Sequence, residues 1–284
     1  MILKSLKKEN MKNIIRKNIK LLFVILGVCI TLTSCDYVKV KDAVYPDQLI
    51  YMPAAVDGVF YINDVPTRIG DVPTPGTPYK FLVDLPNGKF NVPLSVYRSG
   101  VNNDGGFTVD IAVNTDTITS LINSESLTGA TILPSDKYSI EPAVVMADGK
   151  EIASFNLKVD LAFLMANYPD MIYALGVGIS STQRKTNPKF ATTIVVIDTK
   201  IMKPTADFTS NADDTNSKLI NFTNASSYGI SFSWNFGDGS AVSGATSPSH
   251  TYSTAGTYTV TLTAVGITGD TDKSILSSVI TVLE

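Results

Sequence analysis

The chain has 284 residues, of which 44% are hydrophobic and 17% charged. This length suits one large or two modest globular domains, and the composition excludes a disordered chain. The charge is uneven, because seven of the 23 Lys and Arg but only one of the 26 acidic residues lie in residues 1–34. The remainder is therefore acidic, which argues against nucleic acid or an anionic membrane face as a partner.

The N-terminus carries the pattern of an export signal. A basic stretch precedes an apolar run over residues 21–32, which is shorter than the ~20 residues of a membrane-spanning helix. Leu32-Thr33-Ser34-Cys35 follows and resembles the lipobox of bacterial lipoproteins. The resemblance implies a signal peptide over residues 1–34, acylation of Cys35 and a lipidated tether over residues 35–44. A plain secretory signal with an incidental Cys is the alternative.

Cysteine usage limits how the exported protein is held together. Cys29 lies inside the apolar run and would be removed with the signal peptide, which leaves Cys35 as the only Cys. An intramolecular disulfide is then excluded. An acylated Cys35 would anchor a globular protein to the membrane without spanning it. We expect the outer membrane, with the protein exposed at the cell surface.

Period-two alternation predicts strands in residues 45–200. Apolar residues recur at every second position over residues 90–96, 107–113 and 153–159. Residues 171–180 and 191–198 are more continuously apolar, which is typical of strands buried on both faces. This part of the chain is therefore predicted to be a mainly β domain, ending near residue 200.

Two short segments and one proline depart from the strand pattern. Residues 116–123 and 160–167 each begin with Asp, a good helix cap, and space their apolar residues three or four apart. They are predicted to be short helices at the edge of a sheet. Pro93 lies inside a predicted strand, which indicates an edge strand.

From residue 201 to residue 284 short strands alternate with turns every 8–12 residues or so, the spacing of an immunoglobulin-like sandwich. Phe232, Trp234 and Phe236 alternate and would share one strand face, with Trp234 at the centre of the core. The Gly237–Gly239 turn follows directly. A ligand platform is the alternative interpretation of this aromatic segment, and a calcium loop is an alternative for the acidic turn over residues 211–216.

The same region resembles the polycystic kidney disease (PKD) domain, an Ig-like β-sandwich. The matching residues are Trp234, Phe236, Gly237, Asp238, Gly239, Pro248, His250, Tyr252, Gly256, Tyr258, Val260 and Leu262. The resemblance implies that these residues are structural. It also implies a spacer or interaction module, as PKD domains are beside enzymes and surface proteins.

Residues 45–199 resemble a lipoprotein domain of unknown function from Bacteroidetes, which precedes family-18 glycoside hydrolases or sugar-binding modules. Leu133-Pro134, Tyr138, Gly149 and Lys150 match its pattern, and Gly176 stands where that family commonly has Pro. The resemblance implies a β-sandwich and a role in glycan capture for a polysaccharide-utilisation system, beside an outer-membrane transporter. It supplies no binding residue.

The sequence lacks the residue patterns that common catalytic sites require. His250 is the only His, which leaves no second one for a zinc site, and no phosphate loop or dinucleotide fingerprint appears. A glycosidase needs two carboxylates, but Asp104, Asp110, Asp116 and Glu125 are scattered over predicted loops and strands. We expect no enzyme and no cofactor.

Tyrosines are the aromatic residues of the first domain that could stack on sugar rings. Five flank predicted strands or loops: Tyr45, Tyr51, Tyr61, Tyr79 and Tyr97. Each is also typical of packing, so the ligand contacts stay open. The sequence predicts two β-sandwich domains, residues 45–200 and 201–284, in a non-catalytic glycan-capturing surface lipoprotein. A structural spacer or adhesin-type scaffold that binds a protein partner is the alternative.

Overall fold

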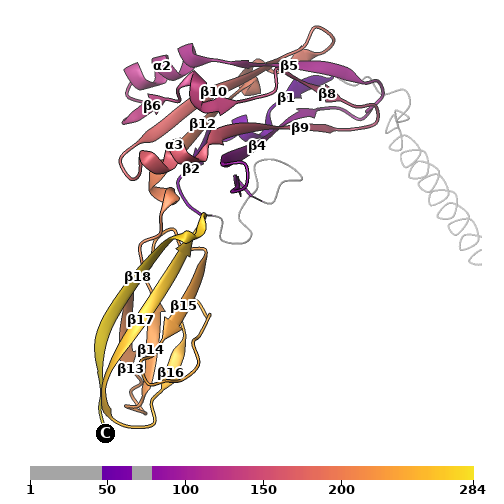
Figure 1. Cartoon of the computed structure of the whole chain (residues 1–284). Helices are drawn as coiled ribbons and strands as arrows, with labels where there is room; N and C mark the ends of the chain where they lie inside the picture. The colour runs from indigo at the N-terminus through magenta and orange to yellow at the C-terminus, as the bar shows by residue number, and fades with distance from the viewer. Residues whose placement is uncertain (1–46, 66–78) are drawn as a thin grey trace, which may run out of the picture. The chain divides into compact units, whose positions relative to one another are not determined.

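The protein is all-β, as predicted, and forms two β-sandwiches (Figure 1). The computed structural model describes residues 47–65 and 79–284. The predicted signal peptide, the tether with Cys35, and Tyr45 lie outside the described residues. Within the described ranges no helix has the length and apolar character needed to cross a membrane.

The first sandwich consists of two six-stranded sheets. One sheet has the strand order β11-β1-β4-β9-β7, with β3 also paired to β4. Its strands are β1 (Leu49–Tyr51), β3 (Leu82–Asp84), β4 (Lys89–Arg98), β7 (Tyr138–Ser139), β9 (Ile152–Asp160) and β11 (Lys185–Thr186). We call it the β4 sheet.

The facing sheet has the order β2-β12-β10-β5-β8, with β6 also paired to β10. Its strands are β2 (Val59–Ile62), β5 (Phe107–Val113), β6 (Ala130–Ile132), β8 (Ala143–Met146), β10 (Ile172–Ser180) and β12 (Thr192–Asp198). We call it the β10 sheet. The continuously apolar strands β10 and β12 are neighbours inside it, and most of their residues are buried, as the sequence predicted.

The alternating residues of the strands fill the space between the two sheets. Phe90, Val92, Leu94 and Val96 of β4 are all fully buried, and the corresponding residues of β5 and β9 join the same core. Alternate residues of a strand point to opposite faces, so the intervening residues of β4 point away from the core. On this outer face of the β4 sheet Pro93 and Ser95 are buried and Tyr97, near the end of the strand, is half-buried.

The prediction that Pro93 marks an edge strand is wrong. Strand β4 lies inside its sheet, paired with β9 along Lys89–Tyr97 on one side. On the other side it pairs with β3 through residues 89–91 and with β1 through residues 97–98. Among the described residues, Pro93 lies between these two short pairings.

Both helices were predicted correctly in position along the chain, but the predicted place of the first one at a sheet edge is wrong. Helix α2 (Thr115–Asn123) covers the outer face of the β10 sheet rather than its edge, because Ile118 packs in one apolar cluster with Ala174 and Val196. Its N-cap is Asn114, whose side chain accepts from Thr117 N, whereas Asp116 lies in the first turn. Helix α3 (Leu161–Ala166) is capped by Asp160, as predicted.

The second sandwich has two three-stranded sheets, of order β13-β14-β16 and β15-β17-β18. Its strands are β13 (Phe208–Ala212), β14 (Leu219–Asn224), β15 (Ser231–Asn235), β16 (Ser249–Thr251), β17 (Gly256–Gly266) and β18 (Gly269–Val282). Trp234 is fully buried between the sheets, beside Phe208 and Phe222. Its indole Nε1 donates to Ala245 O over 2.9 Å, so the buried N–H is satisfied.

Candidate functional site

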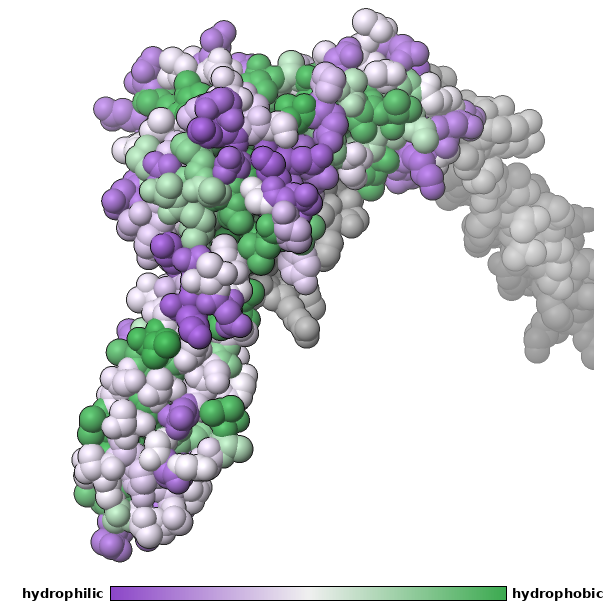
Figure 2. All heavy atoms as spheres, viewed as in Figure 1, coloured by the Kyte–Doolittle hydropathy of each residue, from purple (hydrophilic) through white to green (hydrophobic). Residues whose placement is uncertain are grey.

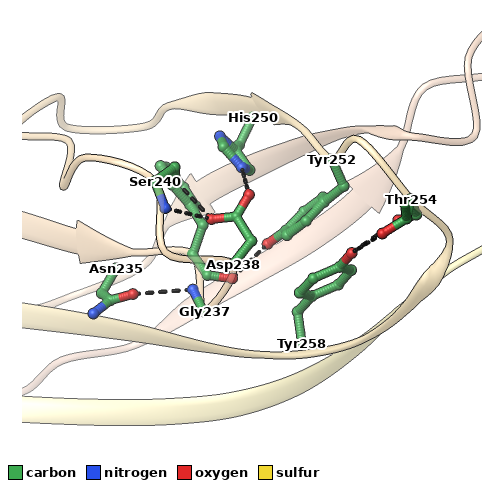
Figure 3. Close-up of polar contacts among 9 residues, drawn as sticks. Asn235, Gly237, Asp238, Ser240, His250, Tyr252, Thr254 and Tyr258 are labelled. Atoms are coloured by element: carbon green, nitrogen blue, oxygen red, sulfur yellow. Dashed lines mark hydrogen bonds and ion pairs between the residues drawn. The ribbon is translucent and has the colours of Figure 1, made fainter.

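The turn after β15 gathers the polar residues of the PKD motif (Figure 3). Asp238 Oδ1 accepts hydrogen bonds from the backbone N and the hydroxyl of Ser240, over 3.1 and 2.6 Å. Its other oxygen, Oδ2, lies 2.7 Å from His250 Nε2. His250 comes from β16 in the opposite sheet, so this contact joins the two sheets of the second sandwich.

Aromatic rings and backbone groups also hold this turn in place. The His250 ring stacks on Phe236 with centroids 4.0 Å apart and planes at 3°. Tyr252, 1% exposed, donates its hydroxyl proton to Phe236 O over 3.0 Å. Gly237 has φ 78°, and a Cβ there would lie 2.3 Å from Thr259 O. Only glycine fits this position.

The remaining motif residues close the turn or begin the next strand. Tyr258 donates its hydroxyl proton to Thr254 O over 2.9 Å. Gly239 has φ 82°, and Gly256 is the first residue of β17. The structure therefore brings the motif of the second sandwich together around Asp238, and its donors and acceptors bond to one another.

The ionisable groups of the turn are tuned by their surroundings. Partial burial raises the pKa of Asp238, but the hydrogen bonds from Ser240 and His250 outweigh it and lower this pKa to about 2. Burial raises the pKa of the Tyr252 hydroxyl well above its ordinary value. A carboxylate that stays ionised and a phenol that stays protonated are suited to holding a turn, not to exchanging protons near neutral pH.

The carboxylates considered for glycoside hydrolysis do not converge. Asp104 lies between β4 and β5, Asp110 on β5, Asp116 in the first turn of α2, and Glu125 just after that helix. Over the described ranges no group of three His, Cys, Asp or Glu side chains is placed to hold a metal ion. Asp213, in the acidic turn, accepts from the backbone N and the hydroxyl of Thr215.

A second cluster lies on the outer face of the β4 sheet, where three aromatic side chains form a row. Tyr51 of β1 and Tyr97 of β4 are directly opposite residues of an antiparallel pair, and their ring centroids are 5.3 Å apart. Phe190 extends the row beyond Tyr51, at a centroid distance of 6.3 Å. All three side chains are half-buried, and Phe190 also packs against the core, in which the chain neighbours Ile50, Met52 and Val96 are buried. We call Tyr51, Tyr97 and Phe190 the aromatic row.

Hydrogen bonds fix the positions of the residues in the aromatic row. Met52 N donates to Phe190 O over 2.9 Å, which ties the 3-10 turn Pro188–Phe190 to the end of β1. Tyr97 Oη donates to Glu151 Oε2 over 3.2 Å, and Asn103 Nδ2 donates to the other oxygen of Glu151 over 3.0 Å. The hydrogen bond to Glu151, followed by burial, raises the pKa of the Tyr97 hydroxyl.

Polar groups lie beside Tyr97 and beside Phe190. The Glu151 carboxylate and the Asn103 amide lie beside Tyr97, and Asn103 Oδ1 is buried without a hydrogen-bond partner among the described residues. The Lys189 ammonium lies 5.2 Å from the centre of the Phe190 ring. The row thus combines apolar ring surface with a small number of hydrogen-bonding groups, the usual composition of a small-ligand site.

Arg98 supports the loops beside the row, and nothing in the sequence pattern had indicated it. The side chain is 1% exposed, although it is charged. Its guanidinium donates to four backbone carbonyls on two loops: Lys150 O at 2.5 Å, Ala147 O at 2.9 Å, Gly105 O at 2.9 Å and Asp104 O at 3.2 Å. These loops carry Asn103 and Glu151, so Arg98 holds in place the groups that bond to Tyr97.

Two of the five tyrosines proposed from the sequence thus belong to one surface cluster. Tyr61 instead packs on the outer face of the β10 sheet, Tyr79 lies just before β3, and Tyr45 is outside the described residues. Phe190 was not considered from the sequence. Its position just before an apolar strand, after Asn187-Pro188, was the only available signal.

Two family models match the chain. Residues 201–282 match the PKD domain, and residues 61–186 match a model described as an N-terminal domain. A search of curated proteins found no match.

Several solved structures are similar to parts of the chain. The PKD1 domain of Vibrio anguillarum Epp is 30% identical, with 28% of this chain and 93% of that chain covered and a TM-score of 0.25. A two-domain protein of unknown function from Bacteroides fragilis is 11% identical, with 67% and 69% covered and a TM-score of 0.36. Bacteroides thetaiotamicron EndoBT-3987, solved with a Man5GlcNAc product, is 12% identical, with 38% and 26% covered and a TM-score of 0.31. Residues 201–282 thus belong to the PKD domain family, and residues 61–186 are similar to an N-terminal domain family.

Proposed function

We propose that the chain is a non-catalytic lipoprotein of the outer membrane that captures glycans, and that the first sandwich makes the contact. The observation that carries this proposal is the aromatic row on the β4 sheet. Three half-buried rings stand side by side on an outer sheet face, with a carboxylate and an amide next to them. Rings supply apolar surface for the faces of sugars, and the polar groups supply hydrogen bonds for their hydroxyls.

The size of the row sets the expected affinity. Three rings with a few polar neighbours offer a small contact surface, so we expect weak to moderate binding of a single glycan. Many copies anchored to one membrane would hold a multivalent polysaccharide more tightly than one site does. Weak single sites on an anchored protein suit capture.

The chemistry beside the row favours binding over hydrolysis. Glu151 bonds to Tyr97 and Asn103, and Asp47, at the start of β1, forms an ion pair with Lys185. A glycosidase needs one carboxyl group as an acid and a second as nucleophile or base, on either side of the scissile bond. No such pair of free carboxylates faces the row among the described residues.

The lipid anchor and the place of the protein are part of the same proposal. Acylation of Cys35 would hold both sandwiches at the outer membrane, where a transporter could receive the captured glycan. The test is incorporation of radiolabelled palmitate by growing cells. Label that enters the full chain but not the Cys35→Ala variant supports the anchor, and equal labelling of both contradicts it.

A glycan array tests the capture role directly. The full chain, purified in detergent, is expected to bind at least one class of host or plant glycan saturably, and the Tyr51→Ala/Tyr97→Ala double variant is expected to lose that binding. Tyr61→Ala is the matched control, because Tyr61 is an equally half-buried tyrosine on the opposite sheet. The proposal would be contradicted if the folded protein bound no glycan on the array, or if Tyr61→Ala lost as much binding as the double variant.

A structural spacer that binds a protein partner is the second candidate function. The observation that favours it is the composition of one outer face of the second sandwich. The outer face of β15, β17 and β18 is made mostly of Ser, Thr, Val and Ile. Figure 2 shows few strongly hydrophilic residues on the visible face of this sandwich, where β17 and β18 lie toward the viewer. A chain that binds no glycan but co-purifies from native outer membranes with one defined protein would favour this role.

A further inference from the structure

The three rings of the aromatic row do not share a plane. Tyr51, the central ring, is tilted by 53° to Tyr97 and by 57° to Phe190. A sugar stacks when its apolar face lies roughly parallel to the aromatic ring. A flat ligand that lies on Tyr51 therefore meets both neighbouring rings at a steep angle and loses their stacking contacts.

The tilt is built into the fold. Tyr51 and Tyr97 are fixed by the antiparallel pairing of β1 with β4, and Phe190 by its backbone bond to Met52. The hydroxyl of Tyr97 is held by Glu151, whose loop is held in turn by Arg98. Tyr97 is therefore held at both ends of its side chain and cannot rotate without breaking a contact, while the positions of Tyr51 and Phe190 are set by their backbones.

The direction of the row is also fixed. Tyr51 and Tyr97 face each other across neighbouring strands, and Phe190 follows on the far side of Tyr51, so the row crosses the strands. Neighbouring strands lie about 4.8 Å apart. The step from Tyr97 to Tyr51 is close to this spacing, at 5.3 Å between ring centroids, and the step from Tyr51 to Phe190, which lies on a turn, is 6.3 Å.

From this geometry we infer that the aromatic row takes a twisted, soluble glycan chain lying across the strands of the β4 sheet, with one sugar on each ring, and that it rejects the flat faces of crystalline polysaccharides. This inference rests on the proposed function and names the class of glycan. Successive sugars of a twisted chain turn relative to one another, so each can lie parallel to its own tilted ring. The site is then filled by three sugars, and a longer chain gains little.

The test compares soluble and crystalline probes with the full chain in detergent. The soluble probes are linear oligosaccharides of one to six units from β-1,4-glucan, α-1,4-glucan, β-1,3-glucan, β-mannan and xylan. The insoluble probes are microcrystalline cellulose and chitin. We expect affinity for at least one soluble series to rise about tenfold or more from one to three units and then to level off, and we expect no retention on the crystalline solids.

Single variants connect the length dependence to the rings. Tyr51→Ala, Tyr97→Ala and Phe190→Ala are each expected to weaken trimer binding about three- to tenfold, with the largest effect at the central Tyr51. Tyr51→Phe keeps the ring and is expected to keep most of the binding, which separates loss of stacking from loss of fold. Tyr61→Ala is again the matched control.

The outcomes separate this inference from the proposed function. Retention on cellulose or chitin that the Tyr51→Ala variant loses would overturn the inference while leaving glycan capture intact. Affinity that is already maximal for a single sugar would do the same. Absence of binding to every probe, soluble and crystalline, together with a silent glycan array, would overturn the proposed function itself.

Discussion

His250 Nε2 lies 2.7 Å from Asp238 Oδ2, and this contact links the turn after β15 to strand β16 of the opposite sheet. The two side chains are 16% and 18% exposed, so water screens the pair only in part. The acid also accepts two hydrogen bonds from Ser240. Asp238 is therefore the polar residue that joins the two sheets of the PKD domain at this end.

The stability of the PKD domain is expected to fall in acid because of Asp238. Its folded pKa of about 2 lies below the ordinary value of 3.8, so the unfolded chain binds more protons between these two values. The stabilisation is complete above about pH 4 and is lost as the pH falls toward 2. After allowance for solvent screening it amounts to about 1–2 kcal/mol.

Urea unfolding between pH 2 and 6 measures this effect, with Trp234 fluorescence as the probe. Trp234 is the only Trp of the chain and is buried in this domain. Asp238→Asn is expected to reduce the loss of unfolding free energy between pH 4 and pH 2. Asp214→Asn, which alters an exposed acid of the same domain, is expected to leave this loss unchanged. If Asp238→Asn loses as much unfolding free energy in acid as the unaltered protein, other groups cause the pH dependence.

The hydroxyls of Tyr252 and Tyr258 offer a matched pair of variants. Tyr252 donates to Phe236 O inside the core, so Tyr252→Phe leaves a buried carbonyl unsatisfied and is expected to cost about 1–2 kcal/mol. Tyr258 donates to Thr254 O near the surface, where water can replace it, and Tyr258→Phe is expected to cost less than about 0.5 kcal/mol. Unfolding followed by Trp234 fluorescence compares the two. Equal losses would mean that burial of the bond does not decide its contribution.

Sequence reasoning was strong where a local pattern decides the structure. The apolar alternation over residues 107–113 coincides with strand β5, because a half-buried strand must repeat every two residues. The PKD resemblance rests on a turn whose glycine at 237 is required by backbone geometry. Such local requirements can be recognised without knowledge of the rest of the fold.

The pairing of strands that are distant in the sequence could not be predicted. Pro93 looked like an edge residue, but the two partners of β4 on that side end before and begin after it. Tyr51, Tyr97 and Phe190 form a row only because β1 pairs with β4 and a turn bonds to Met52. The individual tyrosines were visible in the sequence, but the register that brings them together was not.

Arg98 is expected to be the most sensitive polar residue of the first sandwich. Arg98→Met keeps an apolar stem but leaves up to four partly buried carbonyls without their donor, so we expect a loss of about 3 kcal/mol in the free energy of unfolding. Urea unfolding followed by circular dichroism measures it. Arg184→Met is the control, because Arg184 stacks on Phe107 but lies nearer the surface. A loss below about 1 kcal/mol in Arg98→Met would contradict the role.

Gly176 provides a last test, on the contact between β10 and the start of α2. A Cβ at this residue would lie 2.4 Å from Asn114 O, and Asn114 N in turn donates to Gly176 O over 2.8 Å. The clash involves backbone, which cannot move aside without shifting the residue that caps α2. Gly176→Ala is therefore expected to cost about 1–3 kcal/mol, as overpacking in a core does.

Gly178→Ala is the matched control for this change. Gly178 lies on the same strand, but the nearest atom to an added Cβ is the Thr192 hydroxyl oxygen at 3.4 Å, which a small side-chain rotation relieves. Its cost is expected to stay below that of Gly176→Ala, and amide hydrogen exchange of α2 should accelerate only in the latter. If both variants lose the same stability and α2 exchanges equally in both, loss of glycine from β10 would explain the effect and the contact with Asn114 would not.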